Sequence, residues 1–150
     1  MESFPTARPC AHAWLGSFLG HRQRVHSTMM DGGTEWLVDA SGCRAAALRD
    51  RTRLRQLCEQ IIADLDLHVI GEGLWRLFPA PGGVTGLYLL TESHLACHTY
   101  PESGLATFNL YCCRARPLWS WEQSLRRDLG ANRVQVQVVR RGDAANGGQP

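Results

Sequence analysis

The sequence of 150 residues contains no lysine, because all sixteen of its basic residues are arginines. Without lysine, the chain cannot form the internal aldimine of a pyridoxal phosphate enzyme, use a lysine nucleophile that makes a Schiff base, or bind phosphate through a P-loop lysine. Three broad classes of enzyme are therefore excluded. A mass of 16.7 kDa suffices for one ordinary soluble domain, so a large multidomain enzyme is excluded as well.

The chain also lacks a strong excess of charge and a long apolar segment. Its formal net charge is +2, and residues 31–150 contain thirteen arginines against thirteen acidic residues. A nucleic-acid-binding domain usually has a basic stripe and a pI above about 9, so we expect no nucleic acid partner. The apolar runs are far shorter than the roughly 20 residues of a membrane-spanning helix, so we expect no membrane partner either.

Cysteine use indicates the compartment. The six cysteines occur in a chain that can bury a core without disulfides, and the adjacent pair Cys112 and Cys113 suits a reducing environment. The faintly apolar stretch 11–20 contains histidine and glycine, and no small-residue cleavage site of a signal peptide follows it. The sequence therefore predicts a cytoplasmic protein.

Composition divides the chain into three parts. Residues 1–32 mix proline, glycine, serine and arginine without a period, which predicts either a disordered N-terminal extension or a start site assigned too far upstream of Met29 or Met30. Residues 33–141 have sustained hydrophobic patterns and are predicted to form the domain. Residues 142–150 are rich in glycine and are predicted to be a flexible tail.

Hydrophobic periodicity predicts the order of elements within 33–141. We expect extended segments or strands at 35–41, 66–70, 74–78, 84–90, 95–100, 105–112 and 134–138, and helices at 48–65 and 120–129. Ser120 and Gln123 have the spacing of a capping box, and Gly130 is expected to end the second helix. This order predicts an α+β fold, a two-layer sandwich with helices on one face of a mainly antiparallel sheet. The uncovered face is free for dimerisation or for a ligand.

Polar residues gather between two apolar strands, at 91–102. In an extended chain, alternation separates two sets of side chains, which point to opposite faces: Ser93, Leu95, Cys97 and Thr99 on one, and His94, Ala96 and His98 on the other. Ser93 does not lie in a G-x-S-x-G motif, so a hydrolase triad has little support.

Zinc binding is an alternative for the same region. Its candidate ligands are His94, Cys97, His98, Cys112 and Cys113. Consecutive residues of a strand diverge, so neither adjacent pair easily shares one ion, and we predict no metal. Cys97 and Cys112 are expected instead to be small buried core residues.

Three short motifs and one cysteine carry a family resemblance. The motifs are Gly83-Val84-Thr85-Gly86, Glu92-Ser93-His94 and His98-Thr99-Tyr100-Pro101-Glu102, and the cysteine is Cys113. In this combination they resemble the bacterial and archaeal S-adenosylmethionine decarboxylases, which are pyruvoyl enzymes made as proenzymes. The similarity extends from about Gly33 to Arg140 and implies the fold of that family.

The resemblance implies that the chain cleaves itself between Glu92 and Ser93. Ser93 would attack the Glu92 carbonyl to form an ester, and elimination would convert residue 93 into a pyruvoyl cofactor, which forms a Schiff base with the substrate and replaces the missing lysine chemistry. His98 resembles the base that removes the α-hydrogen of Ser93. Cys113 resembles the proton donor to the decarboxylated carbon, and Thr85 resembles the hydroxyl that supports the processing intermediate.

The resemblance also implies the substrate. Glu102 resembles the carboxylate that accepts hydrogen bonds from ribose, and Phe78 and Tyr100 resemble aromatic side chains that stack on adenine. We therefore expect decarboxylation of S-adenosylmethionine to S-adenosylmethioninamine, the aminopropyl donor for spermidine biosynthesis, by a homodimer of cleaved two-chain protomers. The alternatives are a pyruvoyl-dependent ornithine or arginine decarboxylase on the same fold, and a non-catalytic regulatory paralogue.

Three positions depart from the usual family pattern. Glu35 stands where histidine is common, Asn109 where aspartate is common, and Tyr100 where tryptophan is common. None of them belongs to the processing residues Ser93, His98 and Thr85. Tyr100, together with Phe78 and the loop 79–82, which is one residue longer than usual, is expected to affect the choice of substrate, because adenine is held there. Asn109 is expected to affect it as well, because loss of a carboxylate changes how a cationic amine or sulfonium is received.

Overall fold

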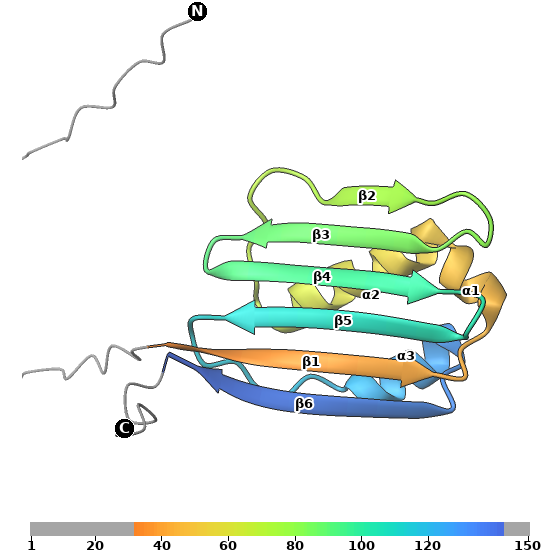
Figure 1. Ribbon diagram of the computed structural model, residues 1–150. Helices are drawn as coiled ribbons and strands as arrows, with labels where there is room; N and C mark the ends of the chain where they lie inside the picture. The colour runs from red at the N-terminus through yellow and green to blue at the C-terminus, as the bar shows by residue number, and fades with distance from the viewer. Residues whose placement is uncertain (1–31, 143–150) are drawn as a thin grey trace, which may run out of the picture.

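The computed structural model describes residues 32–142 (Figure 1), so the predictions for residues 1–31 and 143–150 lie outside the described residues. The elements, in chain order, are β1 (Gly33–Ser41), α1 (Ala45–Arg49), α2 (Arg51–Asp64), β2 (Leu74–Leu77), β3 (Val84–Leu90), β4 (Ser93–Tyr100), β5 (Leu105–Cys112), α3 (Trp121–Leu129) and β6 (Arg133–Arg141). Within this part of the chain, no helix has the length and hydropathy needed to cross a membrane.

The six strands form one antiparallel sheet in the order β2-β3-β4-β5-β1-β6. β1 therefore lies between β5 and β6, so the first and last strands of the domain pair with each other at one side of the sheet. All three helices lie behind the same face of the sheet in Figure 1, and the other face is uncovered among the described residues. The predicted two-layer α+β sandwich is confirmed.

Alternation along the strands separates a core face from an open face. The side chains toward the helices are nearly or fully buried, and on the central strands they include Trp36, Val38, Ala40, Leu95, Cys97, Thr99, Ala106, Phe108, Leu110 and Cys112. The helices supply Leu54 and Ile61 from α2 and Trp121 and Leu125 from α3. The prediction that Cys97 and Cys112 are core residues is confirmed, with exposed fractions of 3% and 0%.

The first helical segment is two helices instead of the single helix expected over 48–65. The chain breaks at Asp50, whose backbone is extended and whose carboxylate accepts a hydrogen bond from the Arg53 amide at 3.0 Å. Aspartate in this position satisfies an amide that has no partner within the helix, so α2 begins directly after it. The predicted apolar face of α2 is correct, because its members are buried.

The last helix, α3, ends as predicted and begins differently. Gly130 follows it with a φ of 71°, a left-handed conformation that suits glycine and stops the helix. The predicted capping box of Ser120 and Gln123 is wrong, because the Ser120 side chain makes no capping hydrogen bond. Its ψ of 55° departs from the extended backbone of an ordinary cap, so the hydroxyl does not meet the first amides.

The segment 66–70 is not the extended element that the sequence predicts. Asp66 has a φ of 51° and Gly71 a φ of 73°, so the chain turns at both ends of this short stretch. Only Val69 bridges to the sheet, opposite Leu90 at the end of β3. This bridge brings the segment against the turn that precedes Ser93, because the Thr91 amide donates to the His68 carbonyl at 2.9 Å.

Candidate active site

A histidine and a threonine face each other on the open side of the sheet. The register of β3 and β4 sets Thr85 directly opposite His98. Their side chains meet, with Thr85 Oγ1 2.5 Å from His98 Nδ1. This hydrogen bond fixes the orientation of the imidazole and leaves Nε2 for another partner.

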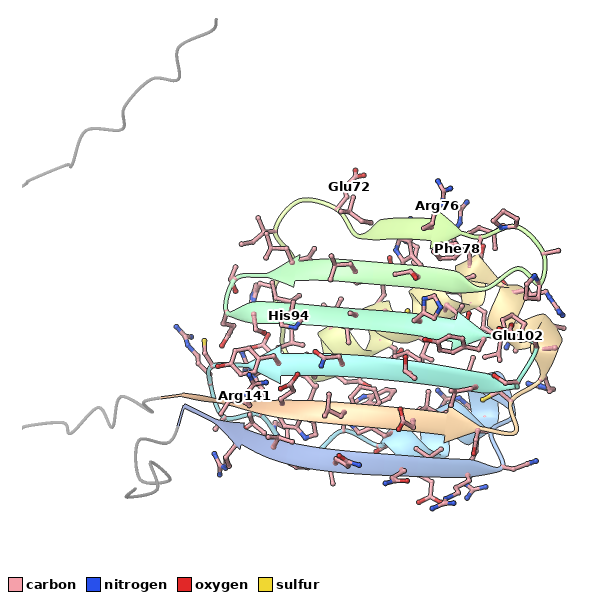
Figure 2. The ribbon with its side chains drawn as sticks, viewed as in Figure 1. Glu72, Arg76, Phe78, His94, Glu102 and Arg141 are labelled. Carbon is pink, nitrogen blue, oxygen red and sulfur yellow. The ribbon has the colours of Figure 1, made fainter. Side chains whose placement is uncertain are left out.

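Two aromatic rings flank the same imidazole. The ring of Phe78 lies 5.7 Å from that of His98, and the ring of Tyr100 lies 4.5 Å from it, both edge to face. Phe78 is 41% exposed and Tyr100 38%, so each offers a surface to a ligand. Glu102 follows in the exposed turn after β4, at the same end of the sheet as Phe78 in Figure 2. We call Phe78, Thr85, His98, Tyr100 and Glu102 the histidine half-site.

A cavity of about 340 Å³ lies beside His98 on the open face. Leu37 and Asp39 of β1 and Asn109 of β5 line it together with Thr85 and His98. Two hollows of about 630 and 640 Å³ lie near α3, around Trp119, and hold none of the predicted site residues. The smaller cavity is therefore the one that adjoins the candidate chemistry.

The Glu92–Ser93 peptide bond lies at the other end of β4. Ser93 Oγ is buried and has no hydrogen-bond partner among residues 32–142. The carbonyl oxygen of Glu92 accepts a hydrogen bond from the Cys113 amide at 3.4 Å, and the Cys113 side chain is exposed. Cys112 pairs with Ser93 across the sheet, and burial raises the pKa of its thiol. We call Glu92, Ser93 and Cys113 the serine half-site.

Two arginines that the sequence did not single out hold the Glu92 side chain. Arg116 Nη2 lies 2.6 Å from Glu92 Oε1, and Arg114 Nε lies 3.5 Å from Glu92 Oε2. The Glu92 side chain is 8% exposed and that of Arg116 17%, whereas Arg114 is 76% exposed. The signal that could have found them is the pair of arginines directly after Cys113 in an electroneutral domain.

The two half-sites lie at opposite ends of one strand. Ser93 begins β4 and His98 stands five residues later, about 16 Å away at the rise of an extended chain. Figure 2 shows the same separation, with His94 at one end of β4 and Glu102 beyond the other. Ser93 points to the core face and His98 to the open face, as alternation predicts. Within one chain, the structure therefore does not bring His98 to Ser93.

A row of polar side chains crosses the open face near the serine half-site. His94 Nε2 lies 3.1 Å from Asn109 Oδ1, the Asn109 amide donates to Glu35 Oε1 at 2.6 Å, and Arg141 forms an ion pair with Glu35. The hydrogen bond from Asn109 and, after it, the contact with Arg141 lower the pKa of Glu35, although partial burial opposes them. Arg141 and the links between these residues were not predicted.

The zinc alternative gains no support. Within the described range 32–142, no group of three or more histidine, cysteine, aspartate or glutamate side chains is arranged to hold a metal ion. His94 makes its contact with Asn109, and His98 with Thr85.

The fold and site define a class of protein: a two-layer α+β domain with a buried serine at a strand start and a threonine-bound histidine on the open face. A model of the S-adenosylmethionine decarboxylase family matches residues 34–142. The S-adenosylmethionine decarboxylase proenzyme of Symbiobacterium thermophilum is 35% identical over 100 residues, which are 65% of this chain and 74% of the relative. That of Thermococcus kodakarensis is 29% identical over 112 residues, 73% of this chain and 76% of the relative.

A solved structure is similar as well. The adenosylmethionine decarboxylase of Aquifex aeolicus superposes with a TM-score of 0.63 and 31% identity, over 79% of this chain and 98% of that one. The chain therefore belongs to the S-adenosylmethionine decarboxylase family. The predicted family, the fold and the enzyme class, a carboxy-lyase of the adenosylmethionine decarboxylase type, are confirmed at this level.

Proposed function

We propose that the chain is a proenzyme that cleaves itself between Glu92 and Ser93 and then decarboxylates S-adenosylmethionine with a pyruvoyl group made from Ser93. The observation that carries the proposal is the Ser93 hydroxyl, which is buried beside the Cys112 thiol, has no partner with good hydrogen-bond geometry within residues 32–142, and is part of the Glu92–Ser93 peptide. A buried hydroxyl without a partner is destabilising, so its presence favours a chemical role. The residues present therefore fit the group.

The cleavage needs no external reagent except water. Ser93 Oγ attacks the Glu92 carbonyl carbon, the C–N bond breaks, and the hydroxyl proton passes to the freed amine of Ser93, which leaves an ester. The amide of Cys113 supports this step, because it donates to the carbonyl oxygen on which negative charge develops. A base removes the Ser93 α-hydrogen, the Cβ–O bond of the ester breaks, and the main-chain carboxylate of Glu92 leaves as the new C-terminus of the first chain. The resulting dehydroalanine tautomerises to an imine, and water replaces its nitrogen, which departs as ammonia.

We assign the base in that step to His98 of a second copy of the chain. The imidazole of the same chain is five residues away on β4, about 16 Å along the strand, which is too far for a side chain to reach. The open faces of two copies can pack against each other, since Leu37, Leu87 and Leu89 are 37–58% exposed there. A two-fold axis between them would set the histidine half-site of each against the serine half-site of the other. A homodimer of cleaved protomers follows from this assignment.

The histidine half-site would then bind the nucleoside. Phe78 and Tyr100 offer exposed ring surface to adenine, and the Glu102 carboxylate suits the ribose hydroxyls. The pyruvoyl group supplies a carbonyl that accepts the electrons released when carbon dioxide leaves. The exposed Cys113 thiol, which follows the Cys112 that pairs with Ser93, would return a proton to the substrate carbon. The product would be S-adenosylmethioninamine, the aminopropyl donor for spermidine biosynthesis.

A cytoplasmic location belongs to the same proposal. The five cysteines of the described region, at 43, 58, 97, 112 and 113, are free thiols, which suits a reducing compartment.

The intact mass of the purified protein under denaturing conditions tests the proposal. Two chains divided after Glu92 are expected, and the chain from residue 93 should be lighter by one ammonia than its serine form. Ser93→Ala should give one uncut chain. Release of carbon dioxide from S-adenosylmethionine, ornithine and arginine, each labelled in the carboxyl group, then identifies the substrate. An uncut wild-type chain would support the regulatory paralogue, and activity on the amino acids alone would support the second alternative.

A further inference from the structure

The segment after Cys113 holds both the main chain and the side chain of Glu92. The Cys113 amide donates to the Glu92 carbonyl oxygen, and Arg116 Nη2 donates to Glu92 Oε1 at 2.6 Å. Both charged side chains are largely buried, with exposed fractions of 8% and 17%. Separating two buried charges leaves each of them without a partner, which costs free energy and favours the paired arrangement. The side-chain carboxylate of Glu92 is therefore already bound to Arg116 when self-cleavage begins.

The ion pair with Arg116 affects the fate of the ester intermediate that the proposed self-cleavage requires. Once Ser93 Oγ carries the Glu92 acyl group, the side-chain carboxylate of Glu92 is linked by three carbons to its own ester carbonyl. Attack of this carboxylate oxygen on the ester carbon would close a six-membered cyclic anhydride and expel the Ser93 alkoxide, which takes up a proton. Water would then open the anhydride. Intramolecular reactions of this kind have very high effective molarities, so the side reaction competes with elimination.

The two routes leave different chains. Elimination breaks the Cβ–O bond of Ser93 and leads to the pyruvoyl group with loss of ammonia. Anhydride formation breaks the acyl–oxygen bond, consumes one water in total, and leaves an ordinary serine at the start of the second chain. Both routes divide the chain after Glu92, so a gel does not distinguish them and a mass does.

We propose that Arg116 is a positioning residue that holds the Glu92 carboxylate away from its own ester, so that self-cleavage yields a pyruvoyl group and not a serine. The inference rests on the proposed self-cleavage. Arg116 Nη2 binds Oε1 directly, and a carboxylate oxygen that accepts a charge-assisted hydrogen bond is a weaker nucleophile. The other oxygen, Oε2, makes no hydrogen bond within the described residues and lies 3.5 Å from Nε of the exposed Arg114, so Arg116 makes the shorter and more buried contact with the group.

The test is the mass ratio of serine-ended to pyruvoyl-ended second chains. Arg116→Gln should raise this ratio roughly tenfold or more, since it frees an intramolecular nucleophile. Arg114→Gln is the matched control, because Arg114 is exposed and lies 3.5 Å from Oε2, and should leave the ratio nearly unchanged. Circular dichroism and thermal unfolding establish that each variant is folded.

The double variant Glu92→Gln with Arg116→Gln separates this role from a merely structural one. The glutamine amide is a far poorer nucleophile than a carboxylate, so the double variant should return the ratio to the wild-type value despite the missing guanidinium. Arg116→Lys, which keeps the charge, should lie between wild type and Arg116→Gln. An unchanged ratio in folded Arg116→Gln, or a high ratio that persists in the double variant, would overturn the inference while the proposed function stands. An uncut wild-type chain would overturn the proposed function itself.

Discussion

Ser93 and His98 lie on the same strand, β4, with side chains on opposite faces of the sheet and about 16 Å between them along the strand. No rearrangement of side chains spans that distance. A role for His98 in removing the Ser93 α-hydrogen therefore requires two copies of the chain, each of which supplies half of two sites. This requirement leads to a genetic test of the half-sites.

Co-expression of two inactive chains should restore self-cleavage. Ser93→Ala lacks the nucleophile and His98→Ala lacks the proposed base, so neither chain alone is expected to give a pyruvoyl-ended second chain. In a mixed dimer, the Ser93 of the His98→Ala chain meets the intact His98 of its partner. With random pairing of equal amounts, about half of the His98→Ala chains should be cut, as intact mass will show.

The control is co-expression of His98→Ala with a chain that carries both substitutions. This partner offers no imidazole, so no pyruvoyl-ended chain should form. Pyruvoyl-ended chains from His98→Ala by itself would contradict the role of His98, and their absence from the mixture of the two single variants would contradict the shared site.

The Thr85 hydroxyl should control the rate of self-cleavage through His98. Thr85→Val keeps the shape of the side chain but removes the 2.5 Å contact with Nδ1, so the imidazole loses the partner that fixes its orientation. We expect cleavage to slow by about 10- to 100-fold, measured as the uncut fraction with time after cell-free synthesis. Thr85→Ser retains the hydroxyl and should cleave within a few-fold of wild type. Equal rates for the valine and serine variants would contradict this role.

The sequence predicted what depends on local periodicity. The alternation that sets Ser93 opposite in direction to His98 follows from the two-residue repeat of a strand, and the structure confirms it. The break at Asp50 was not predicted, because apolar helical spacing continues on both sides and aspartate occurs both inside helices and at caps. Contacts between distant segments have no such repeat. The ion pair of Glu92 with Arg116, 24 positions apart, depends on how the loop after β5 returns to the start of β4.

Glu35 should make the stability of the fold depend on pH in the acidic range. The hydrogen bond from Asn109 and the contact with Arg141 lower its pKa below the ordinary 4.5, so its stabilisation is complete above that value. Below pH 4.5 the unfolded chain binds a proton at Glu35 while the folded chain still resists it. The stabilisation is therefore lost as the pH falls through the lowered pKa of Glu35 in the folded chain. Glu35→Gln does not titrate at this position.

Urea unfolding at pH 6 and pH 3.5 measures this effect. The free energy of unfolding should fall less in Glu35→Gln than in wild type, by on the order of 1 kcal/mol. Asp39→Asn, an exposed carboxylate on the same face of β1, is the control for loss of one negative charge. If Glu35→Gln loses as much stability as wild type between pH 6 and pH 3.5, the contacts of Glu35 with Asn109 and Arg141 are not the source of the pH dependence.

The aromatic rings beside His98 should act on substrate binding and not on self-cleavage. Phe78→Ala and Tyr100→Ala each remove an exposed ring, and base stacking on such a ring contributes about 1–3 kcal/mol. We therefore expect KM for S-adenosylmethionine to rise roughly tenfold, with kcat much less affected and both chains present by mass. Leu118→Ala removes an exposed side chain near α3 and should change neither constant. An unchanged KM in both ring variants would show that adenine does not bind at the histidine half-site.

Thr99 should be a main polar support of the fold beneath the histidine half-site. Its hydroxyl accepts from the Val84 amide at 2.9 Å and donates to the Leu48 carbonyl at 2.8 Å, and so joins β4 to β3 and α1 in the core, where Thr99 is 1% exposed. Thr99→Val fills the same space and leaves both backbone groups buried without this partner, so the free energy of unfolding should fall by about 1–3 kcal/mol.

Thr107→Val is the matched control, because its hydroxyl makes one longer contact of 3.4 Å on the open face, and it should cost less than about 1 kcal/mol. Chemical denaturation of both variants in the Ser93→Ala background, where the chain stays whole, measures the difference, and equal losses would contradict the special role of Thr99.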